Sequence, residues 1–542
     1  MKNSNQETKK NSGSASRSIA LSFYTFLSRI LGLVRDHFMA VTFGTGLVAS
    51  AFSVAYRFPN MFRNLLAEGT LSQSFMPIFS EAEKEGVVQA KKVAGVILTT
   101  LFSFLSIFVG LFYLAAPFFV PSLVGGSKEY SDLVIELSLI LFFLIMTASL
   151  ASIFMAISNS EQKFFVPSLS PIVLNLAYLI VFVFILPFYD SIEEKVRILS
   201  YGIVAGGITQ LLIQAVYVAY LGFSPIYGFD FKHPAIKKIA TLMIPAILGG
   251  GFYQIGLLID IFFANYIQNQ NPGLGAVVSL DYSQRLIQFP TGIIGVALAT
   301  TTLPTLLNAL KSDNKEIIPK ELSNVISFTL FLTLPASIGF LVLGREIIDS
   351  IYYGGKWDSN STDTTLNALR FYAFAIPAYS LNKILTSSFY AFQDTKTPLK
   401  ANITAFVLNL FLNIMLIGTL KHAGLALASA TCSFVTLGLL IFHFSKKYSS
   451  IEGKIILRQL FRFIPSLLVL TSCLILMKFF IGNNFFQYLY ELNLSHANSS
   501  RIYVFLSIGV ATLAYFFIAY LFKLEEFDII FGRVLKRFRR EK

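Results

Sequence analysis

Long apolar windows constrain the fold of this chain more than any other feature. Stretches of about 20 mostly apolar residues, each long enough to cross roughly 30 Å of hydrocarbon as a helix, recur from end to end. The chain of 542 residues is 55% hydrophobic and only 13% charged, which leaves too little polar surface to cover a soluble fold of this size. We therefore predict an all-α integral membrane protein with about 14 transmembrane helices, over residues 17–43, 47–79, 91–118, 132–157, 165–188, 198–221, 238–267, 274–306, 322–344, 363–391, 399–419, 423–445, 457–481 and 502–522.

The two ends of the chain lie outside these windows. Residues 1–16 are polar and low in complexity, which predicts a disordered N-terminus, and residues 523–542 form a basic tail. The first apolar stretch is long and carries charge, unlike the short core of a cleavable signal peptide. The two cysteines, Cys432 and Cys473, fall inside predicted spans, so we expect them to be packing residues rather than a disulfide or a zinc site.

The distribution of basic residues predicts the orientation. With the N-terminus in the cytoplasm, roughly 28 Lys and Arg lie inside and about 7 outside, as the positive-inside rule requires. Both termini are therefore predicted to be cytoplasmic, with the basic segments against the anionic lipid of the inner leaflet. This accounts for the net charge of +13 without a nucleic-acid partner.

Several basic residues nevertheless fall inside the apolar spans, where charge is expensive. An arginine at a helix centre costs about 2.5 to 3.5 kcal/mol on insertion scales. Lys478 lies near the end of its span and is expected to reach the interface. For the others two interpretations stay open: ion pairs with Asp36, Glu68 or Asp281 that only fix helix packing, or contacts with an anionic ligand. The residues concerned are Arg29, Arg35, Arg57, Arg63, Arg285, Arg370 and Lys383.

An internal repeat organises the spans. RFPNMFRNLLAEGTLSQSFMP in the second span matches QFPTGIIGVALATTTLP in the eighth, and the segments that end at Asn175 and Asn409 also correspond. A unit of six spans predicts two pseudo-symmetric lobes, 17–222 and 237–446, related by an axis along the membrane normal, with a central cavity for the ligand. Residues 454–522 lie outside the repeat. We find no nucleophile elbow, phosphate-binding loop or metal-ligand motif, so we predict a transporter and not an enzyme.

Several stretches, in order along nearly the whole chain, resemble the MurJ (MviN) family of lipid II flippases, within the multidrug/oligosaccharidyl-lipid/polysaccharide exporter superfamily. They are SRILGLVRD, RFPNMFRNLLAEGTLSQSFMPIF, YSQRLIQFPTGIIGVALATTTLP, FYAFQDTKTP and KHAGLALASA. The resemblance implies a monomer in the bacterial cytoplasmic (inner) membrane. There it would flip lipid II, an undecaprenyl-pyrophosphate-linked peptidoglycan precursor, from the inner to the outer leaflet by alternating access, for cell wall biogenesis and cell shape. The alternative is a cation-coupled multidrug or other polyprenyl-glycan exporter of the same superfamily.

The resemblance also implies which residues hold the cargo. The family's cavity arginines correspond to Arg29, Arg35, Arg63 and Arg285. Arginine stays charged and offers fork-shaped donors that suit phosphate oxygens. On one helix Arg29 and Arg35 lie about 120° apart and about 9 Å along the axis, so they suit a wide cavity rather than a single oxygen.

The coupling ion and the lipid tail are further implications. No organic cofactor is expected. Some members hold a sodium ion, whose matching positions here are Asp260, Asn409, Asn413, Leu425 and Ser429, although Asn and Ser in spans also serve as plain interhelical hydrogen bonds. The family uses the last two helices, here within 454–522, as a groove for the polyprenyl tail. Ser50 and Gln288 stand where acids are common in the family, so a gating role of those acids is not expected here.

Overall fold

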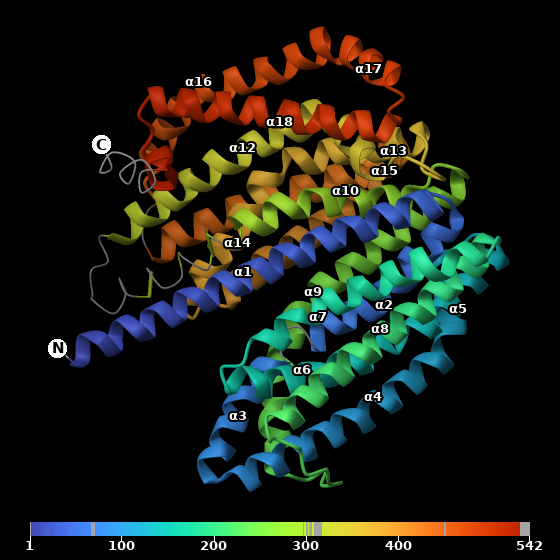
Figure 1. Ribbon diagram of the computed structural model, residues 1–542, viewed down its shortest axis with the longest axis vertical. Helices are drawn as coiled ribbons and strands as arrows, with labels where there is room; N and C mark the ends of the chain where they lie inside the picture. Colours follow the sequence, from blue (N-terminus) through green and yellow to red (C-terminus); the bar gives the residue numbers. More distant parts are fainter. Residues whose placement is uncertain are drawn as a thin grey trace. The chain divides into compact units, whose positions relative to one another are not determined.

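The computed structural model describes residues 2–66, 71–295, 298–299, 302, 306–307, 317–448 and 451–531 (Figure 1). Its regular elements are helices, and the described residues contain one isolated β-bridge, between Gly354 and Trp357. The prediction of an all-α membrane protein is therefore confirmed. The chain divides into two compact units, Met1–Asn269 and Gln270–Lys542, which are described separately below.

The described part of the first unit contains nine α-helices and the short helical turns η2 (Val181–Ile185) and η3 (Leu186–Phe188). Helix α1 begins at Lys2, so the structure is helical over residues 2–16, where composition predicts disorder; the segment lacks proline, and helix satisfies its backbone groups internally. The helices are α1 (Lys2–Phe43), α2 (Leu47–Leu66), α3 (Ser72–Glu85), α4 (Val87–Val124), α5 (Lys128–Phe142), α6 (Leu144–Ser160), α7 (Phe165–Ile180), α8 (Ile192–Tyr220) and α9 (Pro234–Gln270).

Small residues on α8 bring its neighbours close. Helix α8 packs against both α6 and α7. A Cβ atom on Gly206 would lie 2.5 Å from the Cβ of Ala177 on α7, and one on Gly207 would lie 2.8 Å from the Oγ1 of Thr147 on α6. Such close approach is how helices gain packing energy in lipid, where the hydrophobic effect does not drive them together.

Helix α9 belongs to the first unit, although the predicted repeat assigns it to the second lobe, 237–446. Near its end, the Oδ1 of Asn265 accepts a hydrogen bond of 2.7 Å from the Tyr130 hydroxyl, and the Nδ2 of Asn269 donates one of 2.9 Å to the Val124 carbonyl. These polar contacts lie between distant parts of the chain, and the hydrophobic pattern of α9 alone does not specify them.

The second unit is also helical. Its elements are α10 (Ala276–Pro290), the π-helical turn η4 (Thr291–Gly295), α12 (Ile317–Tyr352), α13 (Ser359–Phe374), α14 (Ile376–Ala391), α15 (Lys396–Lys447), α16 (Gly453–Leu476), the π-helical turn η5 (Met477–Ile481), α17 (Gly482–Glu491) and α18 (His496–Leu521).

The two units share a packing pattern that supports the six-span repeat. The second predicted span packs on the fourth through α2 and α5, and the eighth packs on the tenth through α10 and α13. The fourth span breaks at Phe143, between α5 and α6, and the tenth breaks at Ala375, between α13 and α14. Corresponding spans are therefore interrupted in both units.

The predicted count of 14 spans is not confirmed. Within the described residues, eight helical segments are long and apolar enough to cross a membrane. One of them, Lys396–Lys447, covers two predicted spans, 399–419 and 423–445, and its backbone turns at Lys421 with φ 50° and ψ −133°. A Cβ on Gly424 would lie 2.8 Å from the Leu416 carbonyl oxygen, so the turn in the KHAGLALASA stretch requires glycine there.

The aspartate of the FYAFQDTKTP stretch joins the two ends of α15. The Asp394 carboxylate accepts hydrogen bonds from the Thr397 amide (2.9 Å), the Lys447 Nζ (2.8 Å) and the Tyr448 hydroxyl (3.0 Å). Burial acts to raise the pKa of Asp394, but these hydrogen bonds hold it well below the ordinary value. The contact with Asp394 adds to burial in raising the pKa of Tyr448 to about 12.

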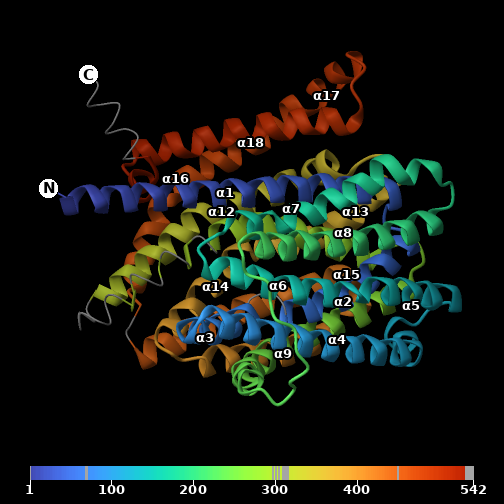
Figure 2. The ribbon, with the colours of Figure 1, turned by 60° about the horizontal axis from the view of Figure 1, so that its bottom comes forward.

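Helices α16 and α18 lie side by side and pack on α12 (Figures 1 and 2). The Phe331 ring of α12 lies 5.3 Å from that of Phe463 on α16 and 5.1 Å from that of Tyr515 on α18. The Tyr515 hydroxyl donates a hydrogen bond of 2.9 Å to the Phe331 carbonyl. Aromatic packing therefore attaches this helix pair to the rest of the second unit.

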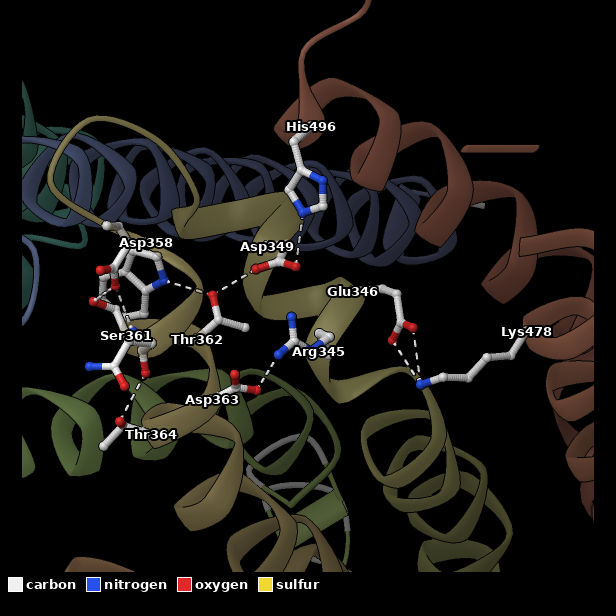
Figure 3. Close-up of polar contacts among 12 residues, drawn as sticks. Arg345, Glu346, Asp349, Asp358, Ser361, Thr362, Asp363, Thr364, Lys478 and His496 are labelled. Carbon is white, nitrogen blue, oxygen red and sulfur yellow. Dashed lines mark hydrogen bonds and ion pairs between the residues drawn. The ribbon is translucent and has the colours of Figure 1, made fainter. Parts of the chain in front are cut away.

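A polar cluster makes a second attachment, at the end of α12 (Figure 3). The Lys478 Nζ lies 3.0 Å from the Glu346 carboxylate and donates a hydrogen bond of 2.7 Å to the Val342 carbonyl. The sequence predicts only that this lysine reaches the membrane interface, whereas the structure shows that it also makes an ion pair within the protein. The His496 Nε2 lies 3.1 Å from the Asp349 carboxylate, which also accepts a bond of 2.6 Å from the Thr362 hydroxyl.

Removal of one partner of the Lys478–Glu346 pair should destabilise the second unit. Glu346→Ala leaves the lysine, whose side chain is 35% exposed, without its carboxylate, and we expect a loss of about 1 to 3 kcal/mol of stability. The double variant Glu346→Ala/Lys478→Met should recover most of it, because replacement of both charges leaves neither uncompensated. Thermal unfolding in detergent measures both.

The exposed Arg197–Glu136 pair, with an N–O distance of 2.7 Å, provides the matched control. Glu136→Ala should change stability by less than about 1 kcal/mol. If Glu346→Ala and the double variant lose the same amount of stability, the ion pair does not attach α16 and α18 to α12.

Candidate functional site

Arg35 is held between α1 and α7 in the first unit. Its Nε and one terminal nitrogen lie 3.0 and 2.9 Å from the Asp36 Oδ1, and the other terminal nitrogen donates a bond of 3.0 Å to the Asn175 Oδ1. The guanidinium carbon lies 5.2 Å from the centre of the Tyr178 ring. A carboxylate, an amide and an aromatic face therefore compensate the charge of this arginine, whose side chain is 21% exposed.

Asn175 also fixes the geometry of α1 beside this arginine. Its Nδ2 donates a bond of 3.1 Å to the Ser28 carbonyl, directly before Arg29. The Arg29 side chain is half-buried and makes no hydrogen bond or ion pair with any residue that the structure describes. Arg29 and Arg35 thus differ, because Arg35 is tightly held whereas Arg29 has no such contact among the described residues.

Arg63 lines a small cavity inside the first unit. The cavity lies among α2, α6, α7 and α8 and has room for about one water molecule. Beside Arg63, the polar side chains that line it are those of Asn60, Thr147 and Gln210. The cavity itself is too small for a pyrophosphate, so a cargo phosphate could enter it only if these helices separate.

Arg285 lies on α10 of the second unit, and two groups on the same helix compensate its charge. One terminal nitrogen lies 3.0 Å from the Asp281 Oδ2, one turn earlier, and the guanidinium carbon lies 5.4 Å from the centre of the Tyr282 ring. Its side chain is 26% exposed. Arg285 therefore has the same two kinds of compensation as Arg35, one carboxylate and one aromatic ring.

The predicted pairing of arginines with intramembrane acids is confirmed for Asp36 and Asp281. The third acid, Glu68, lies outside the described residues. Among the remaining basic residues of the spans, the Lys383 Nζ donates a bond of 3.5 Å to the Thr291 carbonyl, and Arg370 is exposed. The aromatic and amide partners, Tyr178, Tyr282 and Asn175, were not predicted.

The two positions where the family often has acids are polar here. Ser50 is buried, and its hydroxyl donates a bond of 2.9 Å to the Oε1 of Gln268 on α9. Gln288 is exposed near the end of α10. At position 50 a neutral hydrogen bond thus joins α2 to α9.

Three of the residues predicted to bind sodium lie together where α15 folds back on itself. The Asn413 Nδ2 donates a bond of 3.0 Å to the Asn409 Oδ1, and the Asn409 Nδ2 lies 3.5 Å from the Ser429 Oγ. Leu425 is buried in the same half of α15 as Ser429. Their neutral oxygens fit a monovalent cation better than a divalent one. Asp260 lies on α9, in the first unit.

Comparisons with known proteins cover most of the chain. The sequence model of the family described as "Lipid II flippase MurJ" matches residues 39–496. A "Probable lipid II flippase MurJ" of Rickettsia prowazekii (strain Madrid E) is 32% identical over 520 residues, which cover 94% of this chain and 98% of the relative.

Solved structures agree on the fold. One described as "Lipid II flippase MurJ, inward closed conformation" superposes with a TM-score of 0.73 at 24% identity and covers 95% of this chain and 100% of the other. An inward-facing MATE family multidrug resistance transporter of the MOP superfamily has a TM-score of 0.62 at 15% identity, over 77% of this chain and 95% of the other. Both solved structures share the fold of this chain, and the sequence matches are to one family: this chain belongs to the MurJ family of lipid II flippases.

Proposed function

We propose that this protein moves lipid II from the inner to the outer leaflet of the bacterial cytoplasmic membrane by alternating access. The observation that carries the proposal is the set of intramembrane arginines, each half-buried, on α1, α2 and α10. Guanidinium groups suit the oxygens of a diphosphate, which must be sheltered as it crosses hydrocarbon. The relatives' printed names supply the identity of the cargo.

The contacts of Arg35 and Arg285 prepare them for such a cargo. Each guanidinium is positioned by a carboxylate and lies over a tyrosine ring. A side chain that is already ordered loses less rotamer freedom when it binds a phosphate. Arg29, which has no such partner among the described residues, would gain a strong contact from the cargo.

The alternative, a cation-coupled multidrug exporter, is less well supported by these contacts. A pump for cationic drugs needs carboxylates that face its cargo, whereas Asp36 and Asp281 are each engaged by an arginine. The MATE transporters share the fold of this chain at only 15% identity. The charge of the candidate site therefore favours an anionic cargo.

The proposal extends to the orientation in the membrane, the oligomeric state and the absence of a catalytic step. We place both termini in the cytoplasm, because the loops on that side carry the excess of Lys and Arg. We further propose that the protein acts as a monomer and as a transporter without a catalytic step.

Complementation tests the function. The gene should rescue a bacterium depleted of its own lipid II flippase, and Arg29→Ala, Arg63→Ala or Arg285→Ala should abolish growth while the protein still inserts, because each change removes a costly intramembrane charge. Lysine should rescue only partly, since it lacks the planar fork. Arg197→Ala, at an exposed ion pair, is the control. Failure of the parent gene despite normal membrane levels would contradict the assignment.

A second variant at Asp281 tells whether Arg285 binds cargo or only supports helix packing. Arg285→Ala removes the guanidinium that lies 3.0 Å from the Asp281 carboxylate, which is 16% exposed. The double variant Arg285→Ala/Asp281→Asn removes the carboxylate charge together with the guanidinium. If Arg285 binds cargo, the double variant should reach normal protein levels and still not support growth; restored growth would assign the arginine a packing role only.

Sodium binding at Asn409, Asn413 and Ser429 is a second proposal, and it predicts selective stabilisation. At tenfold excess over its Kd, sodium should stabilise the purified protein by about 1.4 kcal/mol, and Asn413→Leu should remove the effect. Asn382→Ala is the control, because Asn382 makes its hydrogen bonds to Ser433 outside this set. Thermal unfolding in sodium, potassium and choline chloride measures it; equal curves in all three salts would leave these residues as interhelical hydrogen bonds.

The polyprenyl tail is proposed to lie along the α16–α18 pair. Cys473, half-buried near the end of α16, and its exposed neighbour Ser472 form a matched pair. Cys473→Trp should weaken binding of the lipid cargo and leave a tail-less head-group analogue unaffected, whereas Ser472→Trp should change neither. Equal loss of both ligands in Cys473→Trp would show that the helix pair supports the fold and does not hold the tail.

A further inference from the structure

A groove of about 650 Å³ lies where the beginning of α16 meets the end of α18. Phe522, directly after α18, closes one side of it, and six residues of α16 line the rest: Lys454, Leu457, Arg458, Phe461, Arg462 and Pro465. The groove contains none of the candidate cargo arginines. Its lining is therefore distinct from the residues of the candidate cargo site.

The α16 residues of the groove form two parallel rows. Successive members of a row are four residues apart, so they share one face of the helix with a rise of about 6 Å per step. One row is basic and the other is apolar, and they run side by side along α16. The basic row is Lys454, Arg458 and Arg462, and the apolar row is Leu457, Phe461 and Pro465.

The basic row is only slightly compensated within the protein. Lys454 and Arg458 make no hydrogen bond or ion pair with any residue in the described part of the chain. The Glu526 carboxyl interacts electrostatically with Arg462. Burial raises the pKa of that carboxyl, however, and so opposes its ionisation. Two exposed cations thus lie beside the groove, and neither is paired with an anion in the described part of the chain.

The apolar side of the groove is equally exposed. Leu457, Phe461 and Phe522 are 56%, 63% and 55% exposed. In the membrane such residues contact acyl chains, while long basic side chains next to them extend toward phosphates at the interface. A ligand that satisfies both rows needs an anionic head and a hydrocarbon chain in one molecule.

We propose that this groove is a binding site for an anionic phospholipid, with the headgroup phosphate on Lys454 and Arg458 and an acyl chain along Leu457, Phe461 and Phe522. Basic pockets between membrane helices recognise anionic lipid in this way. The site is separate from the cargo arginines and goes beyond the proposed flippase activity. Arg462, which interacts electrostatically with Glu526, is the last residue of the basic row.

The test is retention of lipid by the purified full-length protein. Native mass spectrometry with added phosphatidylglycerol should show a bound molecule, and phosphatidylcholine, which has the phosphate but no net charge, should bind much more weakly. Each basic residue near an anionic headgroup is expected to contribute about fivefold, so Lys454→Gln/Arg458→Gln should weaken phosphatidylglycerol binding about 25-fold. Arg458→Lys, which keeps the charge, should retain binding within about twofold and shows that the site folds.

Lys446→Gln is the matched control, because Lys446 is exposed near the end of α15 and does not line the groove. Equal binding of the two phospholipids, or undiminished phosphatidylglycerol binding in the double variant, would overturn the proposal. Displacement of phosphatidylglycerol from the parent protein by undecaprenyl pyrophosphate, but not by inorganic phosphate, would also overturn it and assign the groove to the cargo. Since the readout is lipid binding, it is independent of complementation.

Discussion

The high cost of a guanidinium ion in a medium that solvates charge poorly is the constraint on which the interior of this protein depends. Arg35 in the first unit and Arg285 in the second each meet it with a carboxylate and a tyrosine ring. For Arg285 this carboxylate and this ring lie within one turn of the same helix, α10. For Arg35 the carboxylate is the next residue in the chain, while the ring and an amide come from α7. The first arrangement needs only a helix, and the second needs a folded unit.

Corresponding helices of the two halves pack in the same way, but their corresponding polar residues make different contacts. Asn175 and Asn409 end corresponding segments of the two halves. Asn175 holds Arg35 and the α1 backbone, whereas Asn409 contacts Asn413 and Ser429 within α15. Sequence duplication thus leaves matched positions free to take separate roles, one beside the candidate anion site and one in the candidate sodium site.

Much of the fold could be predicted from apolar periodicity, because a helix in lipid satisfies its own backbone. The Arg285–Asp281 pair was also accessible, since residues four apart on a helix are neighbours. The break at Ala375 has a local signal in Pro377, which disfavours helix just before it; the break at Phe143 has none. The grouping of α9 with the first unit and the Arg35–Asn175 bond depend on tertiary contacts, which a pattern along one helix does not encode.

The pairing of arginines with carboxylates also bears on the electrical work of transport. A charge that moves through the whole membrane potential exchanges about 2.3 kcal/mol per 100 mV. The Arg35–Asp36 and Arg285–Asp281 pairs carry no net charge, so their displacement adds almost no voltage dependence to a change of conformation. Any dependence of the empty protein on membrane potential must then come from other groups, and a bound diphosphate would make the loaded protein respond differently from the empty one.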